Sequence, residues 1–173
     1  MWELSLNEVL NQPMTELFIS IGSNIDRENN FRSALKSLEK LFGSIKVSSL
    51  YESESVGFSG APFYNGVIVL QTDKTLEEAK NYLTAIENEH GRTRNEQKFS
   101  SRTLDLDLLL YGNLICPEKN IPRDEIESYA FVLEPLAEIA PTHLHPVKNS
   151  SYQDLWAQYD KTDLKQKRIA FSR

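Results

Sequence analysis

Hydrophobic positions in the first two thirds of the chain switch between two spacings, one typical of strands and one typical of helices. Runs that are apolar throughout or at alternate positions predict four strands, at 17–21, 45–51, 63–72 and 104–111. Apolar residues three and four apart predict two helices, at 31–42, closed by Gly43, and at 76–86, ending at Gly91. The elements therefore follow the order strand, helix, strand, strand, helix, strand.

This order predicts an α+β fold, a ferredoxin-like α/β sandwich with a mainly antiparallel sheet. The second and third strands form a hairpin with a long loop at 53–62, rich in Ser and Gly. Further helices are predicted at 130–139 and 152–159 as C-terminal helical additions. We expect residues 1–15 to be an N-terminal extension, 16–160 the domain, and 161–173 a polar, loosely held tail.

Composition narrows the class of protein. The formal net charge of −6 over 173 residues argues against a general nucleic-acid binder. The N-terminal segment lacks the basic and apolar regions of a signal peptide, and no apolar run reaches transmembrane length. The single cysteine, Cys116, cannot form an internal disulfide. We therefore expect a cytoplasmic protein without membrane contacts, and a monomer.

Two acidic residues in the last strand are the first candidates for chemistry. Alternation places Asp105 and Asp107 on one face of that strand, and Leu104, Leu106, Leu108 and Leu110 on the other. Two close carboxylates repel each other, and Mg²⁺ between them removes the repulsion while keeping sites for phosphate oxygens. The alternative is a solvent-facing sheet whose carboxylates are only hydrated.

A basic loop directly precedes these carboxylates. Within eleven residues it carries four cations, Arg92, Arg94, Lys98 and Arg102, against one acid, Glu96. Guanidinium groups bind phosphate oxygens at two points, so a basic loop beside an acidic strand favours a triphosphate with its metal. The alternative is a polar loop whose arginines pair with surface acids.

The remaining candidates lie in the earlier strands. Gly22 is followed by Ser23 and Asn24 without the spacing of a P-loop, which predicts a tight turn or, alternatively, close approach of a flat ligand. Asn65 interrupts an apolar strand, and its amide can donate to and accept from the edge of a heterocycle. For each aromatic residue taken alone, a place in the core is the default interpretation.

Taken together, these motifs resemble the 6-hydroxymethyl-7,8-dihydropterin pyrophosphokinase family. The similarity covers about residues 17–146 and is strongest over the run from Arg102 to Gly112. It also includes the segments 21–24, 63–65, 87–92 and 131–136. The resemblance implies transfer of pyrophosphate from Mg-ATP to the hydroxymethyl group of the pterin, with release of AMP, in tetrahydrofolate biosynthesis.

The resemblance also implies a role for each candidate residue. Asp105 and Asp107 would hold two Mg²⁺ ions, and Arg92 and Arg102 would stabilise charge on the triphosphate. The nucleotide site would further include Glu87, Arg94, Lys98, the backbone of Leu108, and Arg123. Pterin binding would involve Gly22, Ser53, Val56, Phe63, Asn65, Phe99 and Phe131. The loops 58–62 and 95–101 would close over both substrates.

Several positions depart from the family pattern. Asn95, Glu118 and Tyr129 stand where basic residues are common, and Arg123 stands where a histidine is usual. Each lost charge-assisted contact would weaken ATP binding by about 1–3 kcal/mol. Two alternatives to the active enzyme follow: a divergent relative that binds pterin or nucleotide without efficient transfer, and a ferredoxin-like interaction domain without a ligand.

Overall fold

The computed structural model describes residues 13–91 and 103–173. Its strands are β1 (Thr15–Ser23), β2 (Ile45–Val47), β3 (Leu50–Ser53), β4 (Phe63–Thr72), β5 (Asp105–Tyr111) and β6 (Lys167–Ile169). Its helices are α2 (Arg27–Phe42), α3 (Leu76–Glu89), α4 (Glu125–Ser128), α5 (Ala130–Ile139) and α6 (Tyr152–Gln158), with a 3₁₀ turn at Pro117–Lys119.

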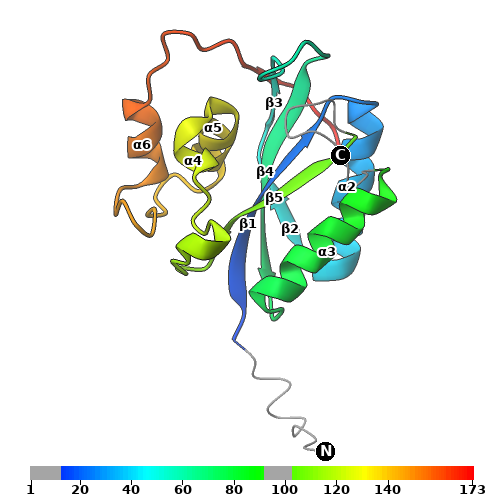
Figure 1. The fold of residues 1–173 in the computed structure, drawn as a ribbon, viewed down its shortest axis with the longest axis vertical. Coiled ribbons are helices and arrows are strands. Elements are labelled where there is room, and N and C mark those ends of the chain that lie inside the picture. The colour runs from blue at the N-terminus through cyan, green and yellow to red at the C-terminus, as the bar shows by residue number, and fades with distance from the viewer. Residues whose placement is uncertain (1–12, 92–102) are drawn as a thin grey trace, which may run out of the picture.

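One antiparallel sheet divides the molecule into two layers of helices. The strands lie in the order β5-β1-β4-β3-β6, and β2 also pairs with β4. Helices α2 and α3 cover one face, while α4, α5 and α6 lie against the other (Figure 1). The predicted ferredoxin-like sandwich with C-terminal helical additions is confirmed.

Each face of the sheet has its own hydrophobic core. Leu17, Ile19 and Ile21 of β1 belong to the cluster under α2 and α3, whereas Phe18 belongs to the cluster under α5. This split follows from the alternation of side chains along a strand. A β-strand residue can therefore be assigned to the α2–α3 side or to the α5 side by its position in the alternation.

The strand predicted at 45–51 is interrupted at Ser48. The Ser48 N–H donates to the carbonyl of Val67 at 2.9 Å, and the Ser48 hydroxyl accepts from the N–H of Val67 at 2.9 Å. A side-chain oxygen thus replaces one backbone acceptor of the ladder. The prediction of one strand was wrong, because β2 and β3 pair with β4 on either side of this break.

A β-bulge changes the predicted faces of β5. Phe18 pairs with Leu110 and Ile19 with Leu108, so Leu109 has no partner in β1. Leu109 and Leu110 both reach the α5 side, and the placement of Leu110 with Leu104 was wrong. Both aspartates precede the bulge, so they still share one face.

The C-terminal tail makes more contacts with the rest of the domain than predicted. It crosses from α6 to end beside α2 (Figure 1), and on the way β6 pairs with β3, with Leu50 opposite Ile169. Phe171 then packs edge-on against Phe31, with ring centroids 5.5 Å apart. The expectation of a loosely held tail was wrong. None of the helices that the structure describes is long and apolar enough to cross a membrane.

Candidate active site

The α5 side of the sheet gathers most of the predicted site residues that the structure describes. Asp105 and Asp107 alternate with Leu106 and share a face with Leu109, which packs in the cluster under α5. Asn65 lies two residues from Val67 of the same cluster. The two halves of the predicted site therefore open on one surface.

The strand register aligns these residues in a row across the sheet. Asp105 of β5 is opposite Gly22 of β1, Gly22 is opposite Asn65 of β4, and Asn65 is opposite Tyr51 of β3. Neighbouring strands lie about 4.8 Å apart, so Asp105 and Asn65 are separated by roughly 10 Å. The residue between them is Gly22, which has no side chain to project from the sheet.

The neutral end of this row is buried and hydrogen-bonded. The Asn65 amide donates to the Ser53 hydroxyl at 2.6 Å, and both residues are about 7% exposed. A Cβ placed on Gly22 would lie 3.1 Å from Asn65 Oδ1. A side chain at position 22 would therefore crowd Asn65, and glycine leaves the amide in place. The predicted tight turn at Gly22 was wrong, because Gly22 lies inside β1 and the turn follows it, with Asp26 left-handed at φ 41°.

One predicted aromatic residue lies beside this neutral end, since a Cβ on Gly22 would lie 3.7 Å from the ring of Phe63. Phe63 meets Phe58 of the 54–62 loop edge-on, with centroids 6.4 Å apart. Phe131, at the start of α5, stacks on Tyr129 at 4.9 Å. Val56 is exposed in the same loop. Phe63 and Phe131 are both partly exposed, and Phe131 also packs against the core under α5, so each leaves part of its ring free to cover a ligand.

The turn after β1 holds the end of the 54–62 loop. The Asn24 amide donates to the carbonyl of Ala61 at 3.0 Å, and Arg27 donates to the carbonyl of Pro62 at 2.9 Å. Arg27 is also ion-paired with Glu52 at 2.8 Å on the α2 side of the sheet. Sequence analysis did not identify these anchors, because they join segments more than thirty residues apart.

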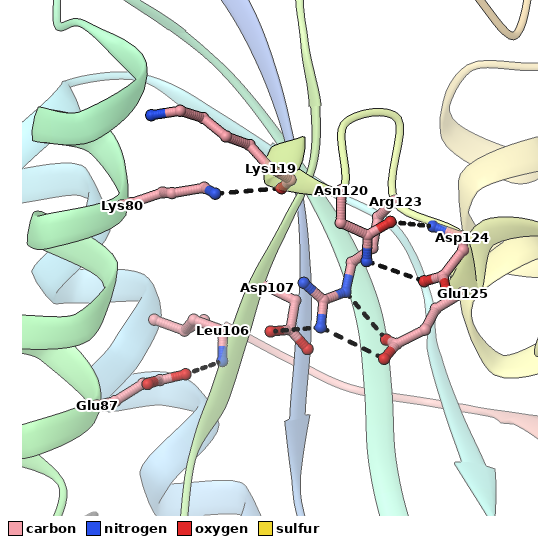
Figure 2. Close-up of polar contacts among 9 residues, drawn as sticks. All are labelled: Lys80, Glu87, Leu106, Asp107, Lys119, Asn120, Arg123, Asp124 and Glu125. Atoms are coloured by element: carbon pink, nitrogen blue, oxygen red, sulfur yellow. Dashed lines mark hydrogen bonds and ion pairs between the residues drawn. The ribbon is translucent and has the colours of Figure 1, made fainter. Parts of the chain in front are cut away.

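The charged end of the row contains a three-membered ion group. Arg123 Nη2 lies 3.3 Å from Asp107 Oδ1, and the same guanidinium contacts Glu125 at 3.1 and 3.3 Å (Figure 2). Burial and the charge of Asp105 raise the pKa of Asp107 to about 7, although Arg123 opposes the shift. The raised pKa reflects the cost of ionising Asp107 on a partly buried surface beside Asp105, a cost that a bound cation would reduce.

A pocket of about 190 Å³ lies beside this ion group at the outer edge of β5. On its α3 side, the buried carboxylate of Glu87 accepts from the Leu106 N–H at 2.8 Å (Figure 2). Across the pocket, Lys80 Nζ donates to the carbonyl of Lys119 at 3.3 Å. Its lining residues are Lys80, Leu83, Thr84, Glu87, Leu106, Asp107, Leu108, Lys119 and Arg123. The predicted nucleotide residues Glu87, Leu108 and Arg123 therefore meet at one pocket.

The ligands at Asp105 and Asp107 suit Mg²⁺, which needs few protein ligands, better than a metal whose ligands all come from the protein. Among residues 13–91 and 103–173, no group of three or more His, Cys, Asp and Glu side chains is arranged to hold a metal. Mg²⁺ is commonly held by one or two carboxylates, with substrate phosphates and water as its other ligands. The paired aspartates beside a pocket lined by cationic side chains fit that pattern.

Five predicted residues, Arg92, Arg94, Lys98, Phe99 and Arg102, lie outside the described residues. Other residues at the site were missed by sequence analysis, chief among them Glu125 and Lys80. Glu125 follows Arg123 by two residues in a segment without periodicity, so nothing in its spacing indicated a contact. Lys80 is a partly exposed position of α3, and its spacing resembles that of any solvated helix lysine.

The fold itself indicates the class of protein. The crystal structure of wild-type Plasmodium falciparum HPPK-DHPS with pterin and p-hydroxybenzoate is similar, with a TM-score of 0.67 over 92% of this chain and 47% of that chain. Its 16% identity establishes the likeness of fold alone. The chain thus has the fold of an HPPK-type α/β sandwich.

The sequence comparison identifies the family. A model of the family described as 7,8-dihydro-6-hydroxymethylpterin-pyrophosphokinase (HPPK) matches residues 18–141, and the chain belongs to this family.

Individual relatives agree with this assignment. The chain is 37% identical over 131 residues to the 2-amino-4-hydroxy-6-hydroxymethyldihydropteridine pyrophosphokinase of Pseudomonas aeruginosa, covering 72% of this chain and 80% of that protein. It is 35% identical to the protein of the same name from Porphyromonas gingivalis, covering 77% and 95%. The Folate synthesis bifunctional protein of Arabidopsis thaliana is 38% identical, but the match spans only 27% of its length.

Proposed function

We propose that the protein transfers the β,γ-diphosphate of ATP to the hydroxymethyl oxygen of 6-hydroxymethyl-7,8-dihydropterin and releases AMP. Its family and the names of its bacterial relatives support this activity. The observation that carries the proposal is the row Asp105–Gly22–Asn65, which places a pair of carboxylates and a buried amide on one face of the sheet, separated by a glycine.

The neutral end of the row suits a flat, polar heterocycle. Asn65 is held by Ser53, so the orientation of its amide is fixed before a ligand arrives. Gly22 provides a floor without a side chain between Asn65 and Asp105. A pterin with its pyrimidine edge on Asn65 would direct its hydroxymethyl group toward the aspartates. Phe63 and Phe131 are proposed to enclose the ring, and backbone groups near Ser53 and Val56 to complete the pocket.

The charged end suits the nucleotide. The pocket at the edge of β5 is proposed to hold the adenosine moiety against Glu87 and the backbone of Leu108. The triphosphate would then extend past Arg123 toward Asp105 and Asp107. Arg92, Arg94, Lys98 and Arg102 are proposed to contact its phosphates, and the loop that bears them and Phe99 to close the site.

The reaction needs positioning and charge neutralisation more than covalent chemistry. Mg²⁺ bound at Asp105 and Asp107, as two ions in our proposal, would neutralise the phosphates and orient the β-phosphorus. The pterin oxygen forms a bond to that phosphorus, and the bond to the α,β-bridging oxygen breaks. AMP leaves with the bridging oxygen, and the hydroxyl proton is released. The residues of the chain hold the two substrates in line and exclude water.

The setting of the enzyme is also a proposal. We infer a monomer that acts in the cytoplasm, with ATP and the pterin as its small-molecule partners and without nucleic-acid or membrane binding. The net charge of −6 supports the part of this inference that concerns nucleic acid.

A steady-state assay tests the proposed function. The full chain is incubated with Mg-ATP and hydroxymethyl-dihydropterin, and AMP is followed over time. We expect AMP only when the pterin and Mg²⁺ are both present. Binding of the pterin without AMP formation would favour the divergent, non-catalytic relative instead. Omission of the pterin is the control for plain ATP hydrolysis.

A further inference from the structure

Arg123 lies between two carboxylates, and its contacts with them are unequal. Asp107 receives one contact, from Nη2 at 3.3 Å. Glu125 receives two, from Nε at 3.1 Å and from Nη2 at 3.3 Å. All three side chains are about one quarter exposed, at 26%, 23% and 26% for Arg123, Asp107 and Glu125. The guanidinium is therefore held mainly by Glu125 and touches Asp107 at one end (Figure 2).

The backbone around Arg123 is fixed independently of this ion group. The Arg123 N–H donates to the carbonyl of Leu109 at 3.0 Å, which ties the segment to β5. Asn120 then holds Asp124 from both sides, accepting from its N–H and donating to its carboxylate, each at 3.0 Å. Glu125 begins α4. The guanidinium can thus change partner by side-chain rotation while the backbone stays in place.

A divalent cation at Asp107 would conflict with the present position of Arg123. Both cations would compete for the same carboxylate, and their like charges repel each other. The contact with Glu125 needs no change when the contact with Asp107 is lost. Arg123 also lines the pocket at the edge of β5, so a displaced guanidinium stays within reach of a nucleotide bound there.

We propose that Arg123 is a displaceable counter-ion of the metal site, with Glu125 as the positioning residue that keeps it at hand. In the ligand-free protein Arg123 neutralises Asp107. When a divalent cation takes Asp107, Arg123 stays on Glu125 and contacts the nucleotide phosphates. This inference rests on the proposed function, because it takes Asp107 as a metal ligand.

The exchange makes metal and nucleotide binding mutually dependent. Metal alone must break the Arg123–Asp107 contact and then lie close to a second cation, so it binds weakly. Metal with nucleotide supplies phosphate oxygens for the displaced guanidinium, so it binds more tightly. Arg123 therefore opposes binding of the metal alone and favours binding of the metal–nucleotide complex. A purely structural ion pair would affect both kinds of binding in the same direction.

Binding of Mn²⁺ to the full chain without nucleotide, measured by electron paramagnetic resonance of free Mn²⁺, tests this proposal. Arg123→Gln is expected to bind Mn²⁺ about tenfold more tightly than the unmodified protein, because a competing positive charge is removed. The same variant is expected to bind Mn²⁺ with a non-hydrolysable ATP analogue about tenfold more weakly. The control is Arg173→Gln, which removes an arginine ion-paired with Glu39 of α2, away from the site, and should change neither value.

Glu125→Gln provides a second test with the opposite sign. Without its main partner, Arg123 rests on Asp107 alone, so Mn²⁺ alone is expected to bind about threefold more weakly. The nucleotide complex is also expected to weaken, and this effect should disappear when Arg123→Gln is already present. Loss of nucleotide affinity that persists in the double variant would mean that Glu125 does not act through Arg123.

Asp107→Asn separates this inference from the proposed function. If Asp107→Asn removes Mn²⁺ binding but Arg123→Gln does not strengthen it, the counter-ion proposal is wrong and the metal site stands. If Mn²⁺ binding survives Asp107→Asn, the metal assignment in the proposed function fails and the counter-ion proposal fails with it. Tighter Mn²⁺ binding in Arg123→Gln that depends on Asp107 supports both.

Discussion

The two ends of the candidate site are held by different kinds of interaction. At the neutral end, Asn65 and Ser53 share one buried hydrogen bond, and Gly22 fits against Asn65 by close packing. At the charged end, Asp107, Arg123 and Glu125 are linked by ion pairs at a partly exposed edge. The neutral end lies in the interior of the sheet, while the charged end lies on the edge strand β5.

This difference suggests a division of labour. A buried hydrogen bond and a tight packing contact allow one geometry, so the neutral end selects the shape and polarity of a ligand before it binds. Ion pairs in a solvated setting can exchange partners at little loss, so the charged end can accept metal and phosphates during each cycle. Substitutions at the two ends should therefore impair the activity of the protein in different ways.

The largest expected effect lies at the charged end. Asp107→Asn removes a proposed metal ligand, and kcat is expected to fall by roughly 10³-fold because charge on the phosphates is no longer neutralised. Pterin binding, measured by calorimetry in the absence of nucleotide, should be unchanged. Asp73→Asn, a surface aspartate paired with Lys74, is the matched control. Equal losses in pterin affinity and kcat would contradict a separation of the two ends.

A smaller loss is expected at the neutral end. Asn65→Leu keeps the volume of the side chain but leaves Ser53 and the heterocycle edge without a partner, so the KM for the pterin should rise by about 30-fold. The KM for ATP should stay within about twofold, because the nucleotide pocket is not altered. Gln71→Leu on the same strand, whose amide contacts Glu16, serves as control. A change confined to the KM for ATP would place the pterin elsewhere.

Two glycines allow a sharper comparison. Gly22→Ala brings a methyl group about 3.1 Å from Asn65 Oδ1 on the site face, and Gly66→Ala brings one equally near Leu50 on the α2 side. We expect Gly22→Ala to raise the KM for the pterin by about tenfold through displacement of Asn65. Gly66→Ala should lower the melting temperature and leave that KM unchanged. Similar kinetics in the two variants would mean that Gly22 matters only for packing.

The smallest expected effect is on the free energy of unfolding, and it concerns the hydrogen bonds that join α5 to the neutral end. Glu138 accepts hydrogen bonds from the Tyr51 hydroxyl and, at 2.8 Å, from the Ser49 N–H. Burial alone would raise the pKa of Glu138, but these hydrogen bonds outweigh burial and hold the pKa below its ordinary value. Tyr51→Phe is expected to lower the free energy of unfolding by about 1 kcal/mol at neutral pH.

The pH dependence of this effect has a defined sign. A carboxyl whose pKa is lower in the folded state stabilises the protein above its unfolded pKa and loses that contribution as pH falls through the folded pKa. The difference between Tyr51→Phe and the unmodified protein should therefore shrink below about pH 4.5. Urea unfolding of both proteins between pH 3 and 7 measures it. A constant difference would show that the Tyr51–Glu138 bond does not depend on the charge of Glu138.

Sequence patterns predicted the parts of the molecule that depend on simple periodicity. Helices α2, α3, α5 and α6, the order of the main strands and the shared face of Asp105 and Asp107 follow from spacings of two and of three to four residues. The break at Ser48 and the bulge at Leu109 did not, because each depends on a hydrogen-bonding choice made against a distant strand. β6 is only three residues long and has no pattern of its own.

The residues of the candidate site likewise divide into those that sequence patterns predicted and those that they did not. Asn65 was recognisable because a polar residue in an apolar strand needs partners. Its partner Ser53, and the role of Gly22 in admitting it, depend on the cross-strand register. Glu125 could not be identified, since its contact with Arg123 depends on the conformation of an irregular segment.

The central claim is that the two ends act on two substrates, one on the α5 face of the sheet and one at the adjoining edge of β5, and that a diphosphate is transferred between them. Phosphorus NMR of the reaction mixture tests this most directly. With the full chain, Mg-ATP and hydroxymethyl-dihydropterin, we expect AMP and a pterin diphosphate ester to appear in equal amounts, without ADP. Formation of ADP, or of free inorganic phosphate or pyrophosphate in place of the ester, would contradict the claim.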